Sequence, residues 1–235
     1  MNSFYTRTEL VYGDKIELIK NATVMIVGVG GVGSYAAEAL ARTGVGKLIL
    51  VDKDEIDVTN INRQLHALHS TVGRQKVDVM KERMLDINPD IEVELINQFE
   101  LDEAFLRIPD CTFVIDAIDT ITNKILLIKE CLNQNVPFIS SMGAANKVDP
   151  SMFEISDIRK TQYDPIARII RQKVKKERIK GKIPVVFSKE IPRKQEKVLT
   201  DSNIRKQSTP PGSLAFVPSV VGLICASYVI KIITE

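Results

Sequence analysis

The chain of 235 residues has few of the residues that cross-link or cage a fold. Its three cysteines are far apart and lie in apolar stretches: Cys111, Cys131 and Cys225. An odd number of separated thiols argues against a disulfide framework, so we expect thiols that fill the core of a cytoplasmic protein. There is no Cys-x-x-Cys pair, which argues against a thiolate zinc site.

Long uncharged runs are also scarce. The first ten residues carry Arg7 and Glu9 and lack the apolar run of a signal peptide. One stretch of seventeen residues without a charge, 214–230, includes Pro218 and Gly222 and is short for a membrane span. We predict a buried C-terminal helix there, and a segment that touches a membrane is the less favoured alternative.

The positive charge is concentrated in one segment, although the formal net charge of the chain is only +2. Residues 159–197 hold fourteen Lys or Arg against four Asp or Glu, a local net charge of +10. A charge asymmetry of this size predicts a surface for a partner. A solvated basic helix without a partner is the alternative.

Apolar runs and turn signals alternate in the manner of βα units. We predict strands over 22–27, 47–51, 91–96, 112–115 and 136–140, and helices over 32–43, 75–87 and 122–134. Continuously apolar strands separated by helices are typical of a parallel sheet covered on both faces. The predicted fold class is therefore α/β: a Rossmann-like, doubly wound, mainly parallel sheet with a C-terminal extension and a crossover loop.

A turn over 143–150 divides the chain into two predicted units. Residues 1–145 form the nucleotide-binding unit, and residues 146–235 form a C-terminal region that faces the substrate. In the second unit we predict a basic helix over 164–180, a mobile crossover loop over 189–212 and the closing apolar helix.

The strongest local motif is a glycine-rich turn that follows a predicted strand and opens a helix: Gly28, Gly30, Gly31 and Gly33. In this context the spacing predicts phosphate binding. The first glycine permits the tight turn, the second lets a phosphate approach the backbone, and the third lets helix and strand pack closely. The helix N-terminus then offers free N–H groups to the anion.

The residues after the second strand decide which nucleotide the turn serves. Asp52 ends that strand and is placed to accept hydrogen bonds from ribose hydroxyls, which alone favours NAD. Arg63 and Lys76 follow, and a nicotinamide enzyme has no need of such fixed cations. A triphosphate that is about to lose pyrophosphate does need them, because charge builds on the leaving group. We expect both cations to be exposed in a cleft.

The order of several spaced motifs resembles that of the ubiquitin-activating-like (ThiF/MoeB/HesA) adenylating enzymes. The motifs are Gly-x-Gly-Gly-x-Gly, Val51-Asp52-x-Asp54, Asn60-x-x-Arg63-Gln64, Gly-x-x-Lys76, Ile87-Asn-Pro89 and Asp116-Ala-Ile-Asp119. They cover about residues 5–145.

The resemblance implies a set of roles for these residues. Asp52 would hold the ribose of ATP, and Asn60, Arg63 and Lys76 would hold its phosphates. Asp119 would help to bind Mg²⁺. Arg7 would be lent across a homodimer interface to the partner's ATP, with an exposed terminal charge as the alternative. The implied nucleotide-binding set is completed by Gly28, Gly30, Gly31, Gly33, Asp54 and Gln64.

Members of this family that activate ubiquitin-like sulfur carriers commonly have two Cys-x-x-Cys zinc pairs, and some have a catalytic cysteine in the crossover loop. This chain has no Cys-x-x-Cys pair and no cysteine in 189–212. Thioester chemistry is therefore not expected. Residues 149–167 and the basic helix after them resemble the tRNA threonylcarbamoyladenosine dehydratase branch. That branch uses ATP to activate a carboxylate on a modified tRNA adenosine and closes it into a ring with loss of water. By this resemblance the segment 159–197 would bind the tRNA backbone.

Two other functions remain open at this stage. One is adenylation of the C-terminus of a ubiquitin-like sulfur-carrier protein, which shares the first half-reaction. The other, from a different class, is a NAD-dependent oxidoreductase. For Asp116 a buried structural role is an alternative, and for His66 and His69 we expect surface or packing roles.

Overall fold

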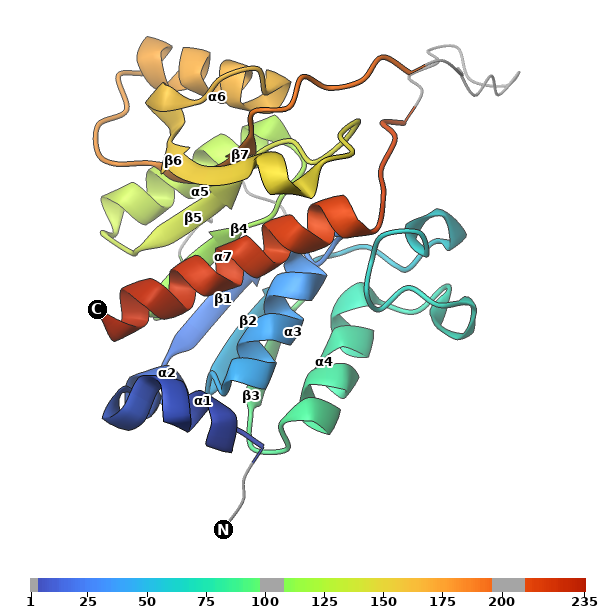
Figure 1. Ribbon diagram of the computed structural model, residues 1–235, viewed down its shortest axis with the longest axis vertical. Coiled ribbons are helices and arrows are strands. Elements are labelled where there is room, and N and C mark those ends of the chain that lie inside the picture. Colours follow the sequence, from blue (N-terminus) through green and yellow to red (C-terminus); the bar gives the residue numbers. More distant parts are fainter. Residues whose placement is uncertain (1–3, 98–107, 196–209) are drawn as a thin grey trace.

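The computed structural model describes residues 4–97, 108–195 and 210–235. A central sheet lies between two layers of helices (Figure 1). In the described part the strands are β1 Thr23–Val27, β2 Lys47–Val51, β3 Glu92–Ile96, β4 Phe113–Asp116, β5 Phe138–Ser141, β6 Phe153–Asp157 and β7 Pro184–Ser188. The α-helices are α1 Thr6–Tyr12, α2 Ile16–Lys20, α3 Gly33–Thr43, α4 Lys76–Ile87, α5 Ile121–Asn133, α6 Pro165–Lys176 and α7 Phe216–Thr234.

The strand order is β3-β2-β1-β4-β5-β7-β6, and β6 is antiparallel to its neighbour while the other pairs are parallel. Strands β2 and β3 lie on one side of β1, and β4 lies on the other side of it. The order therefore reverses between β1 and β4. In open α/β sheets, ligands bind at such a switch point, outside the carboxyl ends of the strands.

Alternate residues of the central strands enter two separate cores, as a sheet covered on both faces requires. Ile26, Leu50 and Ile115 pack with α3, α4 and α7 on one face. Val27 and Val114 pack with α5 and α6 on the other face. The predicted fold class is confirmed.

The strands predicted at 22–27, 47–51, 91–96, 112–115 and 136–140 correspond to β1 to β5, with ends that differ by at most two residues. The prediction from sequence missed β6 and β7, which extend the same sheet beyond β5. The sheet is thus continuous across the boundary predicted at residue 145, and the division into two units stays a prediction. The predicted basic helix 164–180 ends earlier, because Arg178 has a left-handed backbone (φ 53).

The stems of the predicted crossover loop, 189–195 and 210–212, contain no helix or strand. The intervening residues 196–209 lie outside the described residues, so the mobility predicted for the loop stays a prediction.

Helix α7 lies along α3 on the sheet face (Figure 1). Val221, Cys225 and Val229 are fully buried there. A Cβ atom at Gly222 would lie 2.3 Å from the carbonyl oxygen of Val32, so only glycine allows this close approach. Among the described residues α7 is the one helix long and apolar enough to cross a membrane by length and composition. The prediction of a C-terminal helix buried against the fold agrees with its packing.

Candidate active site

The glycine-rich turn lies at the switch point. Gly28 has a left-handed backbone (φ 90), and a Cβ there would lie 2.6 Å from the carbonyl oxygen of Ala117, just after β4. A Cβ at Gly33, where α3 begins, would lie 1.9 Å from the oxygen of Gly28. At Gly30 the nearest side-chain atom would be 3.8 Å away, the Nε2 of Gln64. The backbone at Gly30 is therefore open to a ligand, and the N-terminus of α3 faces the same place.

Asp52 ties the glycine turn to the end of β2. Its Oδ2 accepts a hydrogen bond from the backbone N–H of Val29 (2.7 Å), and its Oδ1 accepts one from the N–H of Asp54 (2.9 Å). Each carboxylate oxygen has a second lone pair. The carboxylate can therefore hold the turn in place and still accept hydrogen bonds from ribose hydroxyls.

Lys76 is buried, with 6% of its surface exposed, so the expectation of an exposed lysine is wrong. The first turn of α4 is docked onto the loop after β2, because the N–H of Lys76 donates to the carbonyl of Asp54. The Nζ atom lies 2.8 Å from Asp54 Oδ2 and 3.9 Å from Asp52 Oδ1. An ammonium group has three donors, so one ion pair leaves donors for a phosphate.

The segment that carries the other cation packs against the glycine turn. Arg63 is half-buried, and its Nη1 donates to the carbonyl of Thr59 (2.8 Å) and to Asn62 Oδ1 (2.9 Å). The side chain of Asn60 closes a capping box with Asp57, accepting from its N–H at 3.1 Å. Asn60 therefore shapes the backbone that presents Arg63.

Gln64 points its amide toward the glycine turn. Its side chain is buried, and its Oε1 has no hydrogen-bond partner among the described residues. A buried amide oxygen without a partner costs free energy, and such groups in native proteins call for an explanation. The amide lies beside the open backbone of Gly30, where a ligand could supply the missing partner.

Asp116 and Asp119 differ sharply in environment. Asp116 is fully buried: its carboxylate receives Lys124 Nζ at 2.9 Å and the hydroxyl of Ser140 at 2.5 Å. This arrangement fits the alternative of a structural carboxylate. Asp119 is exposed in the loop after β4, three residues beyond Asp116. This loop lies at the same edge of the sheet as the glycine turn.

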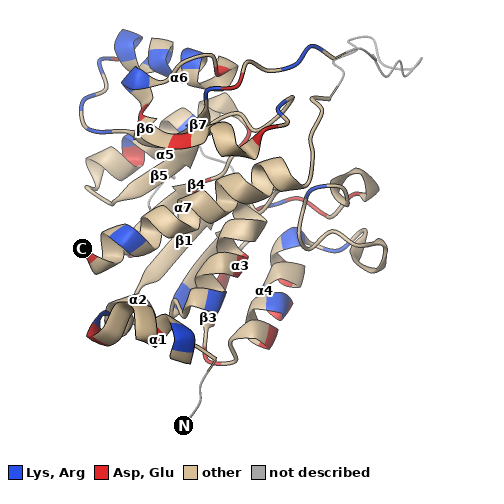
Figure 2. Cartoon of the chain, in the orientation of Figure 1, with Lys and Arg blue, Asp and Glu red and all other residues tan. Residues whose placement is uncertain are grey.

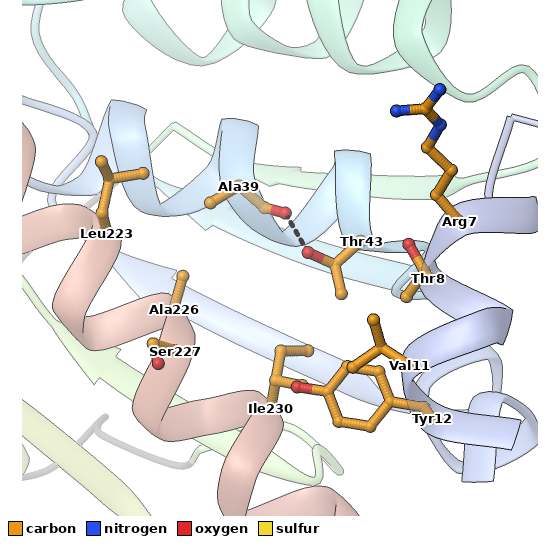
Figure 3. A pocket seen from close by; sticks show the side chains of 10 residues that line it. All are labelled: Arg7, Thr8, Val11, Tyr12, Ala39, Thr43, Leu223, Ala226, Ser227 and Ile230. Carbon is orange, nitrogen blue, oxygen red and sulfur yellow. Dashed lines mark hydrogen bonds between the residues drawn. The ribbon is translucent and has the colours of Figure 1, made fainter.

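Arg7 lies outside this cluster. It belongs to α1 and lines a pocket of about 420 Å³ between α1, α3 and α7. Figure 3 shows its side chain directed away from Thr43, which is the last residue of α3 and lies at the end opposite the glycine turn. Within one chain Arg7 therefore does not join the cluster around Gly28 to Gly33.

The buried thiols are not prepared as nucleophiles. Cys131 and Cys225 are buried and Cys111 is half-buried, and all are free. Burial raises the pKa of Cys111 to about 11 and that of Cys225 to about 12, and it raises the pKa of Cys131 as well. Since the thiolate is the reactive form, these cysteines fit the predicted role of core filler.

A second feature outside the cluster is the basic surface on α6 (Figure 2). A pocket of about 730 Å³ is lined there by six cationic side chains: Arg159, Arg168, Arg171, Lys175, Arg178 and Lys180. Two of them are held by protein oxygens, Arg159 by Asp157 and Arg171 by the carbonyl of Thr161. Within the described residues the other four make no ion pair.

Fold and site together define the class of protein: an α/β protein with the architecture of nucleotide-binding folds, in which fixed cations stand beside a glycine-rich turn at the switch point. The ThiF family matches residues 5–235, and the chain belongs to that family.

Several relatives of the chain are tRNA threonylcarbamoyladenosine dehydratases or adenylyltransferases. It is 53% identical to the tRNA threonylcarbamoyladenosine dehydratase of Bacillus subtilis over 235 residues, 96% of this chain and 92% of the relative. Crystal structures of the E. coli enzyme TcdA with ATP and with AMP superpose with a TM-score of 0.83 at 34% identity, covering 97% of this chain and 93% of theirs. A molybdopterin-synthase adenylyltransferase of Haemophilus influenzae is 33% identical over 68% of this chain and 66% of the relative.

These matches confirm the resemblance inferred from the spaced motifs and the prediction of an ATP-dependent adenylating enzyme. The two alternatives, a carrier-protein substrate and a NAD-dependent oxidoreductase, are less supported.

His66, beside this site, generates a prediction about pH. The ring is 2% exposed, and neither nitrogen has a partner among the described residues. Burial, with a smaller contribution from Lys76, lowers the pKa of His66 from 6.5 to about 4. The unfolded chain therefore binds a proton below pH 6.5 that the folded chain does not, so stability falls as the pH drops from about 6.5 to about 4.

We expect about 2 kcal/mol of the loss in unfolding free energy between pH 7 and about pH 5 to come from this group. His66→Gln should flatten the pH dependence by that amount, measured by urea unfolding at each pH. His69→Gln, at an exposed position, is the control. An unchanged slope in His66→Gln would show that the ring is not held neutral.

Proposed function

We propose that the chain activates, with ATP, the carboxylate of threonylcarbamoyladenosine in tRNA and closes it into a ring. The observation that carries the site assignment is the meeting of three parts at the switch point: the open turn at Gly30, the carboxylate of Asp52 and the cations of Arg63 and Lys76. Similarity to dehydratases over nearly the whole chain supports the substrate.

ATP lies across the carboxyl ends of β1, β2 and β4 in this proposal. Its phosphates face the turn Gly28 to Gly33, with Gly31 in the loop's centre, and its ribose hydroxyls donate to Asp52. Asn60 shapes the phosphate-facing segment, Gln64 donates its amide beside Gly30, and Asp54 holds Lys76 in reach. These are the residues that the sequence motifs assign to nucleotide binding.

The substrate carboxylate attacks the α-phosphorus, and pyrophosphate leaves. Negative charge that builds on the leaving group is stabilised by Arg63 and Lys76, both fixed before the reaction, so no reorganisation is needed in the transition state. A nucleophile within the substrate then attacks the acyl carbon of the adenylate and AMP leaves with one former carboxylate oxygen. The net change in the substrate is loss of water, and no protein nucleophile is required.

Mg²⁺ fits this site through Asp119. In triphosphate sites this ion is usually held by one or two carboxylates together with phosphates and water, so a single exposed carboxylate at the edge is a suitable donor. Bound there, it would neutralise charge on the phosphates.

Arg63→Ala should lower product formation on the order of 10²-fold or more, as for loss of one preorganised charge donor. Folding should be unchanged, because within the described part of the chain the side chain bonds only to its own loop. The measurement is mass analysis of tRNA nucleosides after incubation with ATP, together with pyrophosphate exchange. Lys76→Ala should have a similar effect but also reduce stability, since it leaves Asp54 and Asp52 close together without their cation.

Wild-type turnover in a well-folded Arg63→Ala variant would remove Arg63 from the phosphate site. Product formation that depends on a carrier protein ending in Gly-Gly, with tRNA irrelevant, would favour the carrier alternative instead.

Arg7 acts in a homodimer in this proposal, on the ATP of the partner. Its position at the far end of α3 supports this, because it stands apart from the site of its own chain. Leu10 and Val11 on α1 are 83% and 76% exposed, an apolar surface that a second copy would cover.

Mixed dimers test this arrangement. Arg7→Ala and Arg63→Ala dimers should each be nearly inactive, but mixing and re-association should restore about a quarter of wild-type activity. Random assortment makes half of the dimers mixed. If Arg7 of one chain completes the site that contains Arg63 of the other chain, each mixed dimer has one intact site of its two. No recovery after verified subunit exchange would show that Arg7 does not act across an interface.

In this proposal the basic segment 159–197 binds the tRNA backbone. Residues 146–235, which contain this segment, therefore face the substrate, and the reaction takes place in the cytoplasm. The pocket on α6 supports it, because four cations, Arg168, Lys175, Arg178 and Lys180, make no ion pair within the described residues. Unpaired Lys and Arg release counterions when they meet phosphates, and this drives backbone binding.

Reversal of two pocket charges should weaken tRNA binding and flatten its salt dependence. In Lys175→Glu/Lys180→Glu the slope of log affinity against log salt should fall by about one unit for each lysine that no longer neutralises a phosphate. Lys173→Glu/Lys176→Glu makes the same charge change at two positions of α6 outside the pocket and is the matched control. ATP affinity should hardly change in either. Equal effects in the two variants would mean that long-range charge, and not the pocket, attracts the tRNA.

A further inference from the structure

Asn62 connects Arg63 to a distant part of the chain. Its Nδ2 donates to the carbonyl of Ser213 at 3.0 Å, and its Oδ1 accepts from Arg63 Nη1 at 2.9 Å. Only one orientation of the amide satisfies both contacts, since a guanidinium has no acceptor and a carbonyl has no donor. The side chain therefore bridges a fixed donor and a fixed acceptor.

The anchor at Ser213 is itself held firmly. Gly212, next to it, exchanges two hydrogen bonds with Asn146 in the loop after β5: the N–H of Asn146 donates to the Gly212 carbonyl, and the N–H of Gly212 donates to Asn146 Oδ1, both at 2.8 Å. On the other side α7 begins at Phe216, and Pro218 would be 3.2 Å from a Cβ at Gly31. The anchor is thus fixed between the glycine turn and the β5 edge.

The contacts of Arg63 leave one edge of its guanidinium for a ligand. Nη1 has two N–H groups, and it has two acceptors, the carbonyl of Thr59 and the Oδ1 of Asn62. Within the described residues Nε and Nη2 have no partner. These two atoms form the planar fork that binds a phosphate with two parallel hydrogen bonds.

We infer that Asn62 is a positioning residue for the adenylation step. It fixes the plane of the Arg63 guanidinium against the anchor at Ser213, so that the Nε–Nη2 fork faces the phosphates before ATP arrives. This rests on the proposed role of Arg63. Preorganisation of this kind lowers the free energy of the transition state, because a guanidinium that is out of position stabilises the developing charge much less.

A double-mutant cycle tests the inference. Asn62→Ala should lower kcat about 10-fold, which is the usual worth of one hydrogen bond to a charged group, with little change in KM for ATP. In the Arg63→Ala background the same change should have no further effect, because Asn62 acts through Arg63. The assay is cyclisation of threonylcarbamoyladenosine in tRNA, with nucleosides measured by mass.

Three controls separate the outcomes. Asn21→Ala removes another exposed asparagine that donates to a carbonyl, Glu17, far from the site, and should leave kcat unchanged. Asn62→Ser, too short to reach both partners, should reproduce Asn62→Ala, and thermal unfolding checks that both variants are folded. An unchanged kcat, or an equal loss in the Arg63→Ala background, would overturn the inference. Full activity of Arg63→Ala alone would instead overturn the proposed role of Arg63.

Discussion

The carboxylate of Asp52 joins the two loops on which the site depends. One oxygen holds the backbone of the glycine turn at Val29, and the other holds the start of the next loop at Asp54. Lys76 Nζ lies 3.9 Å away and is paired with Asp54. The positions of the glycine turn, of Asp52 and of Lys76 are therefore fixed relative to one another. The same carboxylate that would meet the nucleotide also organises the place where it would lie.

The parallel part of the fold could be predicted because local patterns and tertiary environment agree there. Strands such as β1 and β4 are buried on both faces, so their sequences are continuously apolar, and the turn chemistry between them is explicit. β7 was missed although Pro184–Ser188 is apolar and buried, because it is short and lies between basic stretches. β6 has a mixed, partly exposed sequence at the sheet edge and depends on its pairing with β7. No local pattern could have shown that pairing.

The local geometry at Gly28 and Asp52 was predictable, because the glycine motif specifies its own turn. The burial of Lys76 was not, because it follows from docking of α4 onto the loop after β2, a contact between parts of the chain far apart in sequence. The link from Asn62 to Ser213 spans 151 residues, and a single asparagine in a motif gives no sign of such a partner. Asp116 with Lys124 and Ser140 is a similar case: three polar residues on separate elements that only the folded sheet brings together.

The position of α7 has a consequence for biosynthesis. Pro218 and Gly222 of this helix pack directly against the glycine turn and the first turn of α3, although nearly two hundred residues separate the two in sequence. During translation the motifs for nucleotide binding leave the ribosome early, but the face of α3 that α7 covers stays uncovered until α7 has been made. At about 5–20 residues per second this delay lasts on the order of ten seconds or more. A nascent chain therefore carries the nucleotide motifs well before it can assemble them into a finished site.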